Sequence, residues 1–336
     1  MTGWELNPDF SEESVRTALR IYGFVLIRGV LTAAEVVAVR GELDAGFAVP
    51  YQKDLGSLCT TEVLKYAPVW NTLFKDAVVR SLRAALGPEL YYQNDMDVQR
   101  NNFGQRGWRL HTGWHMDAGS ETGNGYLRSQ HYRFVKCGIF LQDFANGWGG
   151  GIRIKPKSHR GLFEPNPMKR RLFFARRALN RLAHMLRFDV DTFDVPTRAG
   201  DLCFFDSRLL HSSMPPRWAN IRSIGYERNP QIVGFWPDIP REHTKYVIYW
   251  DACNAAMVDD FLRNSARRAA TEPEGMREER MRPAVFTRVL ANRYPEDFPR
   301  QFVATATRCD VGVASLGAQE AEVFRRKLQT MQLMHP

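Results

Sequence analysis

The sequence predicts a mostly β protein, a sandwich or barrel of largely antiparallel sheet with helices at both ends. Short β-rich runs follow one another through the middle of the 336-residue chain, and clusters of Gly, Asn, Pro and Ser separate them. Helical spacing of apolar residues precedes these runs and returns over roughly the last eighty residues. The sequence contains no internal repeat and no low-complexity tract.

The N-terminal part of the chain reads as a helix, a strand and then further helices. Apolar spacing predicts a helix over Phe10–Arg20, and the β-rich run Phe24–Ile27 follows between two glycines. Thr32 with Glu35 three residues later forms the pattern of a capping box, which marks the start of the next helix. Another helix is expected over Ala77–Leu86, where a Gly-Pro pair ends it.

The middle of the chain carries the expected strands, and the C-terminal part carries helices. Each strand run is short, rich in β-branched or aromatic residues and bounded by turn residues. The expected strands are Leu90–Val98, Tyr132–Leu141, Ile152–Lys155, Asp201–Phe205 and Arg222–Glu227, and the expected C-terminal helices include Ala255–Arg268 and Ala318–Leu328.

Composition excludes several classes of protein. Apolar residues make up 44% of the chain and charged residues 25%, proportions that exclude wholesale disorder and a collagen-like fibre. The five cysteines include no CxxC pair, so we expect neither a disulfide framework nor a zinc knuckle. No apolar run has the length of a membrane span, and the first residues lack the pattern of a secretory signal. We therefore expect a cytoplasmic protein.

Positive charge is concentrated in one segment. The formal net charge is +9, and Met168–Arg187 holds seven Lys or Arg residues and no acid. Its leucines fall on one helical face, which is typical either of a surface helix packed on the core or of a helix that docks on an anionic or membrane-embedded substrate. No nucleic-acid partner is expected, because no recognised nucleic-acid module accompanies the segment.

The strongest chemical signal is the tetrapeptide Trp114-His115-Met116-Asp117. In an extended strand, residues two apart point to the same side, so His115 and Asp117 can offer an imidazole nitrogen and a carboxylate oxygen to one metal ion. On its own the pattern is weak, because a surface His beside a solvated Asp gives the same letters.

A second histidine and an arginine follow in the second half of the chain. His211 comes after the apolar run Asp201–Phe205, and Arg222 stands eleven residues later at the head of the next expected strand. A guanidinium matches a carboxylate with two parallel hydrogen bonds. Taken singly, His211 is compatible with a buried core histidine and Arg222 with a surface salt bridge.

Together these residues predict a metal centre. Two histidines and one carboxylate on one metal form the facial triad of non-haem Fe(II) oxygenases, which leaves coordination positions open. A 2-oxo acid can occupy two of them through its keto and carboxylate oxygens, and O2 the remaining one. An Arg deeper in the barrel would then hold the far carboxylate of 2-oxoglutarate.

At these motifs the sequence resembles the phytanoyl-CoA dioxygenase (PhyH-like) family of Fe(II)- and 2-oxoglutarate-dependent oxygenases. The resemblance runs from about Phe10 to Glu227, and it departs from the family pattern at Met116, where Gln is commoner, and at Lys157, where Gly is commoner. Neither departure is at an expected metal ligand. The segments that carry the resemblance are Gly23–Leu31, Trp114–Asp117, Gly151–His159, Gly200–Ser213 and Arg222.

The resemblance implies a fold, cofactors and residue roles. The fold would be a double-stranded β-helix, or jelly roll, with helices packed on one sheet. His115, Asp117 and His211 match the iron ligands, Arg222 matches the residue that grips the C5 carboxylate of 2-oxoglutarate, and Ser213 matches an assisting hydroxyl. The cofactors would be Fe(II), 2-oxoglutarate as co-substrate and O2. We expect one oxygenase domain over 1–336, with its core at about 90–250, a basic helical insert at about 160–195 and a helical C-terminal extension at about 255–336.

The implied reaction is hydroxylation of an unactivated C–H bond with release of succinate and CO2. Related enzymes that halogenate have Ala or Gly at the position of Asp117, so the carboxylate favours hydroxylation. The basic segment and the net charge favour a small, anionic or lipid- or sugar-linked substrate, with peripheral contact to an anionic membrane surface through Met168–Arg187. A jelly-roll binding protein without turnover and a zinc-dependent hydrolase using the same triad are the alternatives.

Overall fold

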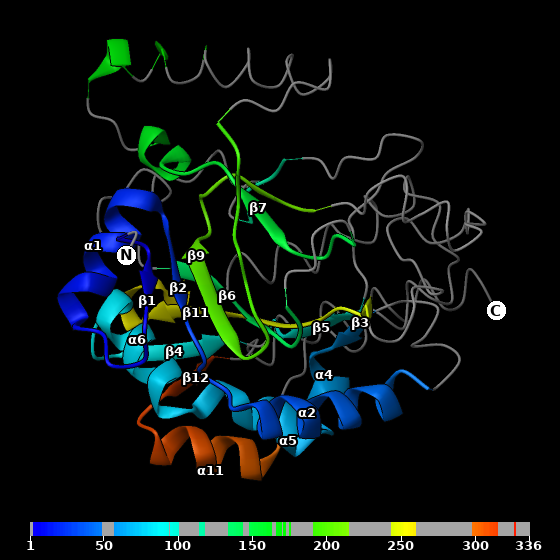
Figure 1. Cartoon of the computed structure of the whole chain (residues 1–336). Coiled ribbons are helices and arrows are strands. Elements are labelled where there is room, and N and C mark those ends of the chain that lie inside the picture. The colour runs from blue at the N-terminus through cyan, green and yellow to red at the C-terminus, as the bar shows by residue number, and fades with distance from the viewer. Residues whose placement is uncertain are drawn as a thin grey trace.

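A computed structural model describes residues 3–48, 57–93, 95–100, 114–117, 134–143, 148–162, 166–169, 171–172, 175, 191–214, 243–259, 298–314 and 326. Two β-sheets face each other, and helices cover the outer face of the larger one (Figure 1). The expectation of a jelly roll with flanking helices is therefore confirmed. None of the helices in the described ranges combines the length and the apolarity needed to span a membrane.

The helices begin and end where local sequence signals place them. Helix α1 is capped by Ser11, whose side chain accepts a hydrogen bond from the Ser14 amide, and ends at Gly23 with a φ of 86°. The capping box of Thr32 and Glu35 at the start of α2 is confirmed. The helical elements are α1 Glu12–Tyr22, α2 Ala33–Gly46, α4 Thr60–Val63, α5 Ala67–Trp70, η1 Asn71–Phe74, α6 Asp76–Leu86, η3 Ser158–Leu162, η5 Ala255–Met257 and α11 Arg300–Arg308.

The large sheet has nine strands in the described part of the chain, and the small sheet has three. The large sheet runs in the order β1-β2-β9-β6-β11-β4-β12, with β5 beside β11 and β3 beside β5; the small sheet runs β10-β7-β8. The strands are β1 Glu5–Leu6, β2 Phe24–Ile27, β3 Ser57–Cys59, β4 Leu90–Gln93, β5 Asp97–Arg100, β6 Phe134–Phe140, β7 Ile152–Ile154, β8 Phe193–Asp194, β9 Asp201–Asp206, β10 His211–Ser213, β11 Tyr246–Asn254 and β12 Gly312–Ala314.

Side chains on the two faces of the large sheet enter two different cores. On β9, Leu202 and Phe204 join the core beneath the helices, whereas Cys203 and Phe205 join the core between the sheets. This alternation follows from the two-residue period of a strand. Helices α2, α5 and α11 lie along the lower side of the large sheet, and β7 of the small sheet lies above it (Figure 1). The small sheet and the inner face of the large sheet therefore share the second core.

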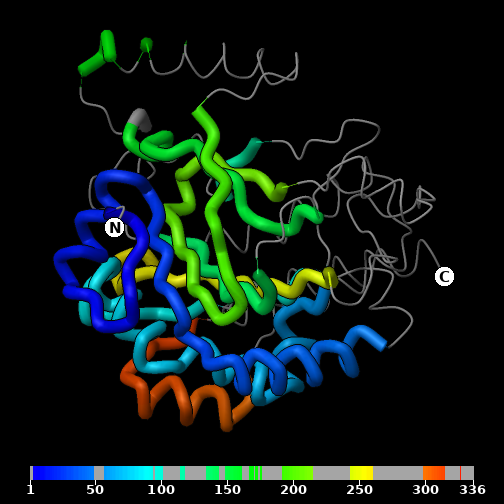
Figure 2. The backbone as a smooth tube through the Cα atoms, in the orientation of Figure 1, coloured from blue at the N-terminus to red at the C-terminus, as the bar shows by residue number. Residues whose placement is uncertain are grey.

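The C-terminal helix α11 packs against the N-terminal helical layer, although the two are far apart in sequence. Figure 2 shows the orange segment lying beside the blue and cyan helices. The Phe302 ring lies 5.3 Å from that of Trp70 and 5.1 Å from that of Phe74. Edge contacts of this kind are favourable arrangements for aromatic rings, so α11 stabilises the helical layer.

Two strand expectations require correction. The run Leu90–Val98 forms two strands rather than one, because β4 pairs with Ala252–Asn254 of β11 and β5 pairs with Tyr246–Tyr249 of the same strand. Strand β11 itself was missed, although its Tyr-Val-Ile-Tyr-Trp sequence is rich in β-forming residues. Arg222–Glu227, Ala318–Leu328 except Arg326, and most of Ala255–Arg268 lie outside the described residues.

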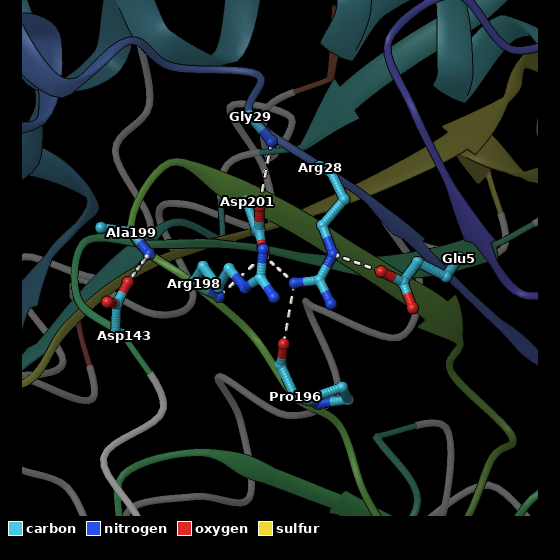
Figure 3. A network of polar contacts seen from close by, with 8 residues as sticks. All are labelled: Glu5, Arg28, Gly29, Asp143, Pro196, Arg198, Ala199 and Asp201. Atoms are coloured by element: carbon cyan, nitrogen blue, oxygen red, sulfur yellow. Dashed lines mark hydrogen bonds and ion pairs between the residues drawn. The ribbon is translucent and has the colours of Figure 1, made fainter. Parts of the chain in front are cut away.

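A polar network fastens the edge of the large sheet (Figure 3). The Asp201 carboxylate accepts hydrogen bonds from the Gly29 amide at 2.9 Å and the Arg198 amide at 2.7 Å, and it pairs with Arg28 at 2.5 Å. Arg28 also donates to Glu5 at 2.8 Å and to the Pro196 carbonyl at 2.8 Å. Asp201 is 2% exposed. The network therefore joins β1, the turn after β2 and the turn before β9.

Buried His159 is expected to make the protein less stable in mild acid. Burial lowers its pKa to about 4, and Arg208 and Arg160 oppose its protonation while Asp206 favours it. In the unfolded chain a histidine takes up its proton near pH 6.5. The unfolded state thus binds more protons between pH 6.5 and 4, and the free energy of unfolding falls as the pH falls through this window.

The loss attributable to His159 is at most about 3.5 kcal/mol, because each unit by which its pKa is lowered corresponds to about 1.4 kcal/mol. Urea unfolding of metal-free protein at pH 7 and pH 4.5 measures it. The His159→Gln variant should lose less stability over the same interval. Equal losses in the variant and the unchanged protein would show that His159 is not the responsible group.

Candidate metal centre

Main-chain pairing brings the two predicted histidine ligands together. His115 and His211 form an antiparallel β-bridge in which each amide donates to the other's carbonyl, at 3.1 and 3.0 Å. Residues directly opposite each other in such a pair project to the same face. Accordingly, the two imidazole rings lie with their centroids 4.3 Å apart.

Asp117 completes the set of three. Its Oδ1 lies 3.6 Å from Nε2 of His115 and 3.5 Å from Nε2 of His211. One potential ligand atom from each of the three residues lies within 4.8 Å of the others. Imidazole and carboxylate ligands bind a metal at roughly 2.0–2.2 Å, so ligand atoms at these separations can share one ion. The donor set is the two-histidine, one-carboxylate combination that suits non-haem Fe(II).

The surroundings of His211 fix the orientation of its ring. Its Nδ1 lies 3.0 Å from the Leu209 carbonyl, which selects the tautomer with the proton on Nδ1 and directs the Nε2 lone pair towards Asp117. Burial lowers the pKa of His211 to about 4, although Asp117 acts in the opposite direction. The ring is therefore neutral at physiological pH. The His115 side chain, by contrast, is 55% exposed, so the centre opens to solvent on that side.

Phe205 forms the apolar wall next to His211. The two ring centroids are 4.5 Å apart, and Phe205 projects from β9 into the core between the sheets. An apolar neighbour fixes the imidazole and restricts water around it. The centre is consequently closed on the His211 side and open on the His115 side.

The remaining predicted site residues are only partly placed. Ser213 lies two residues after His211 on β10, opposite Ile152 of β7, and thus on the same face as His211. Its role as an assisting hydroxyl remains a prediction. Arg222 lies outside the described residues, as does His111, which stands four residues before His115 and is not expected to be a ligand.

Sequence reasoning missed one charged side chain near this centre. Lys136 stands in the middle of the apolar strand β6, pairs with Asp251 of β11 and lies beside Phe205 in the register of β9. A lysine within an otherwise apolar strand was the available signal.

Comparisons with known proteins identify a family. The sequence pattern described as "Phytanoyl-CoA dioxygenase (PhyH)" matches residues 19–224, which include all three centre residues. A search of curated protein sequences gave no match.

Three solved structures resemble this chain, but with low sequence identity and low TM-scores. The non-haem α-ketoglutarate-dependent epimerase SnoN from nogalamycin biosynthesis is 16% identical, covers 73% of this chain and 83% of its own, and has a TM-score of 0.45. The non-haem monooxygenase ThoJ, in complex with nickel, is 16% identical over 71% and 77%, with a TM-score of 0.46. HygX from Streptomyces hygroscopicus, with nickel and 2-oxoglutarate bound, is 18% identical over 71% and 85%, with a TM-score of 0.46. Similarities this low carry over neither a reaction nor a substrate.

Proposed function

Because the chain belongs to the phytanoyl-CoA dioxygenase family, whose enzymes use Fe(II), 2-oxoglutarate and O2, we propose that it hydroxylates an unactivated C–H bond of a small molecule. In the overall reaction one oxygen atom of O2 enters the product and the other enters succinate, while 2-oxoglutarate loses CO2. The observation that carries the proposal is the convergence of His115, Asp117 and His211 within ligand-sharing distance.

The three residues would hold the ferrous ion, and the ion supplies the oxidising chemistry once 2-oxoglutarate and O2 are bound. His211 contributes a neutral, oriented nitrogen, and Asp117 contributes the negative charge. The Asp117 carboxylate supports hydroxylation rather than halogenation, because it leaves no ligand position vacant for a halide. Arg222 is proposed to hold the C5 carboxylate of 2-oxoglutarate, with Ser213 assisting.

We further propose an anionic substrate. Support comes from the net charge of +9 and from the Met168–Arg187 segment. Within the described part of that segment, Lys169 and Arg171 are exposed, and Met168 and Leu172 are 65% and 63% exposed. Basic and apolar side chains together on a surface favour an anionic lipid or lipid-linked ligand. Contact with a membrane surface remains a prediction.

Anaerobic addition of Fe(II) and 2-oxoglutarate tests the proposed function. We expect a weak visible metal-to-ligand charge-transfer band that requires both components, because the 2-oxo acid chelates the iron. On admission of air together with ascorbate as a two-electron donor, the sample should form succinate and CO2 without substrate, the second oxygen atom being reduced to water. Fe(II) with succinate in place of 2-oxoglutarate is the matched control and should give no band.

The alternatives give different outcomes in the same experiment. A binding protein without turnover would form no succinate after air is admitted. A zinc hydrolase would retain zinc in metal analysis of the isolated protein and would show no charge-transfer band. Either result would contradict the proposed function.

A further inference from the structure

A buried ion pair crosses the interior face of the large sheet. Lys136 of β6 and Asp251 of β11 stand directly opposite each other in the antiparallel register, and their Nζ and Oδ1 atoms are 3.3 Å apart. The two side chains are only 16% and 7% exposed. A buried ion pair is seldom the most stable way to fill a core, since apolar residues of similar size often serve as well or better. The pair therefore requires an explanation other than stability.

Lys136 faces the space that contains the candidate metal centre. Its neighbours Val135 and Cys137 enter the core beneath the helices, so the alternation along β6 turns Lys136 to the opposite face, between the sheets. Phe205 of β9 is its cross-strand partner on that face, and the Phe205 ring lies 4.5 Å from the ring of His211. Lys136 is thus one cross-strand step from a residue that touches a predicted metal ligand.

The charges around Lys136 keep its amine protonated. Burial lowers the pKa of Lys136, but the carboxylates of Asp251, Asp95, Asp97 and Asp117 outweigh burial and hold the pKa above its ordinary value. Asp117 is one of the predicted metal ligands, and the Lys136 charge in turn opposes protonation of His211. The ammonium and the centre therefore lie within electrostatic range of each other.

Strand β6 leaves room for the tyrosine next to this pair. Gly138, the next residue of β6 on the interior face, stands opposite Tyr249 of β11. A Cβ atom on Gly138 would lie 2.9 Å from the Tyr249 ring, closer than side chains tolerate. Glycine at this position lets the ring lie over the strand. On the interior face of the large sheet, the charged Lys136 is therefore followed along β6 by a glycine that makes room for a tyrosine ring, so this face is not uniformly apolar.

We propose that Lys136 is a further co-substrate-binding residue, whose ammonium donates a hydrogen bond to a carboxylate of the 2-oxo acid at the metal centre. This role rests on the proposed function. An ammonium has three donors, so Lys136 can keep its contact with Asp251 and still meet a second carboxylate. A carboxylate removed from water needs such a donor.

Binding of 2-oxoglutarate to the Fe(II)-loaded protein under anaerobic conditions, measured by calorimetry, tests the role. Lys136→Met removes the charge and keeps the length of the side chain. We expect its dissociation constant for 2-oxoglutarate to rise at least about 10-fold, the effect of losing one charge-assisted hydrogen bond. Fe(II) affinity should remain within about threefold, because Lys136 is not a metal ligand.

Variants of Asp251 and of an exposed lysine separate binding from folding. Lys136→Met alone leaves Asp251 buried without its ammonium, so the double variant Lys136→Met/Asp251→Asn removes both charges and should bind 2-oxoglutarate as weakly. Asp251→Asn alone keeps the ammonium and should bind it within about threefold of the unchanged protein. Lys65→Met, at an exposed position, should bind it normally.

The outcomes distinguish this role from the proposed function. The role would be overturned if both Lys136 variants bound 2-oxoglutarate with dissociation constants within twofold of the unchanged protein. It would also be overturned if Arg222→Met lost 2-oxoglutarate binding while Lys136→Met bound it normally. In both cases the oxygenase proposal would stand. Failure of the unchanged protein to bind 2-oxoglutarate would overturn the proposed function and this role with it.

Discussion

Replacing His211 with Ala is expected to abolish succinate formation from 2-oxoglutarate and to weaken Fe(II) binding by at least about 100-fold. The ring would supply one of the three proposed protein ligands, and the contact of its Nδ1 with the Leu209 carbonyl orients Nε2. The two residues left behind cannot form a facial triad. Metal titration and a succinate assay on the purified variant measure the two effects.

The same losses are expected for His115→Ala and Asp117→Ala. Asp9→Ala, which removes an exposed carboxylate on the N-terminal segment, is the matched control and should retain both metal binding and succinate formation. Turnover that persists in all three centre variants would refute the assignment of these ligands.

The largest effect on stability is expected at Asp201. Asp201→Ala leaves the Gly29 and Arg198 amides without their acceptor and removes one carboxylate from the mostly buried Arg28. Breaking a buried pair by removing one partner costs roughly 3–5 kcal/mol, because the other charge stays buried. The midpoint of guanidinium unfolding, followed by circular dichroism, measures this loss.

An exposed ion pair offers the contrast. Glu12→Ala removes one of the two glutamate partners of Arg16 on the surface of α1, where the Glu12 and Arg16 side chains are 64% and 49% exposed. Solvent and salt screen such pairs, so no measurable change is expected. If Asp201→Ala unfolds at the same denaturant concentration as Glu12→Ala, the network of Figure 3 does not hold the sheet edge.

The parts of the fold that could be predicted from the sequence are those with local causes. Phe24–Ile27 is a short β-rich run bounded by glycines, which predicts β2. The capping box of Thr32 and Glu35 needs only four consecutive residues, and it predicts the start of α2. The approach of His115 to His211 could also be predicted, because two histidines and an aspartate in this order match the ligand set of a facial-triad metal centre.

The parts that escaped prediction depend on pairing between distant segments. Strands β4 and β5 pair with different parts of β11, and this pairing sets where β4 ends and β5 begins. The division of Leu90–Val98 into two strands therefore cannot be predicted from that segment alone. Likewise, nothing local shows that Lys136 meets Asp251, more than one hundred residues later, rather than solvent. Cross-strand partners are fixed by the tertiary fold, not by the residues that flank each strand.

Because His115 and His211 are paired through their backbones, an ion bound by both imidazoles would have a structural role as well as a catalytic one. Such an ion would link the Trp114–Asp117 segment to β10, so metal binding would stabilise the smaller sheet. Stripping the ion with a chelator would relax that sheet first. The nine-stranded sheet has its own apolar layer under the helices and would keep its shape.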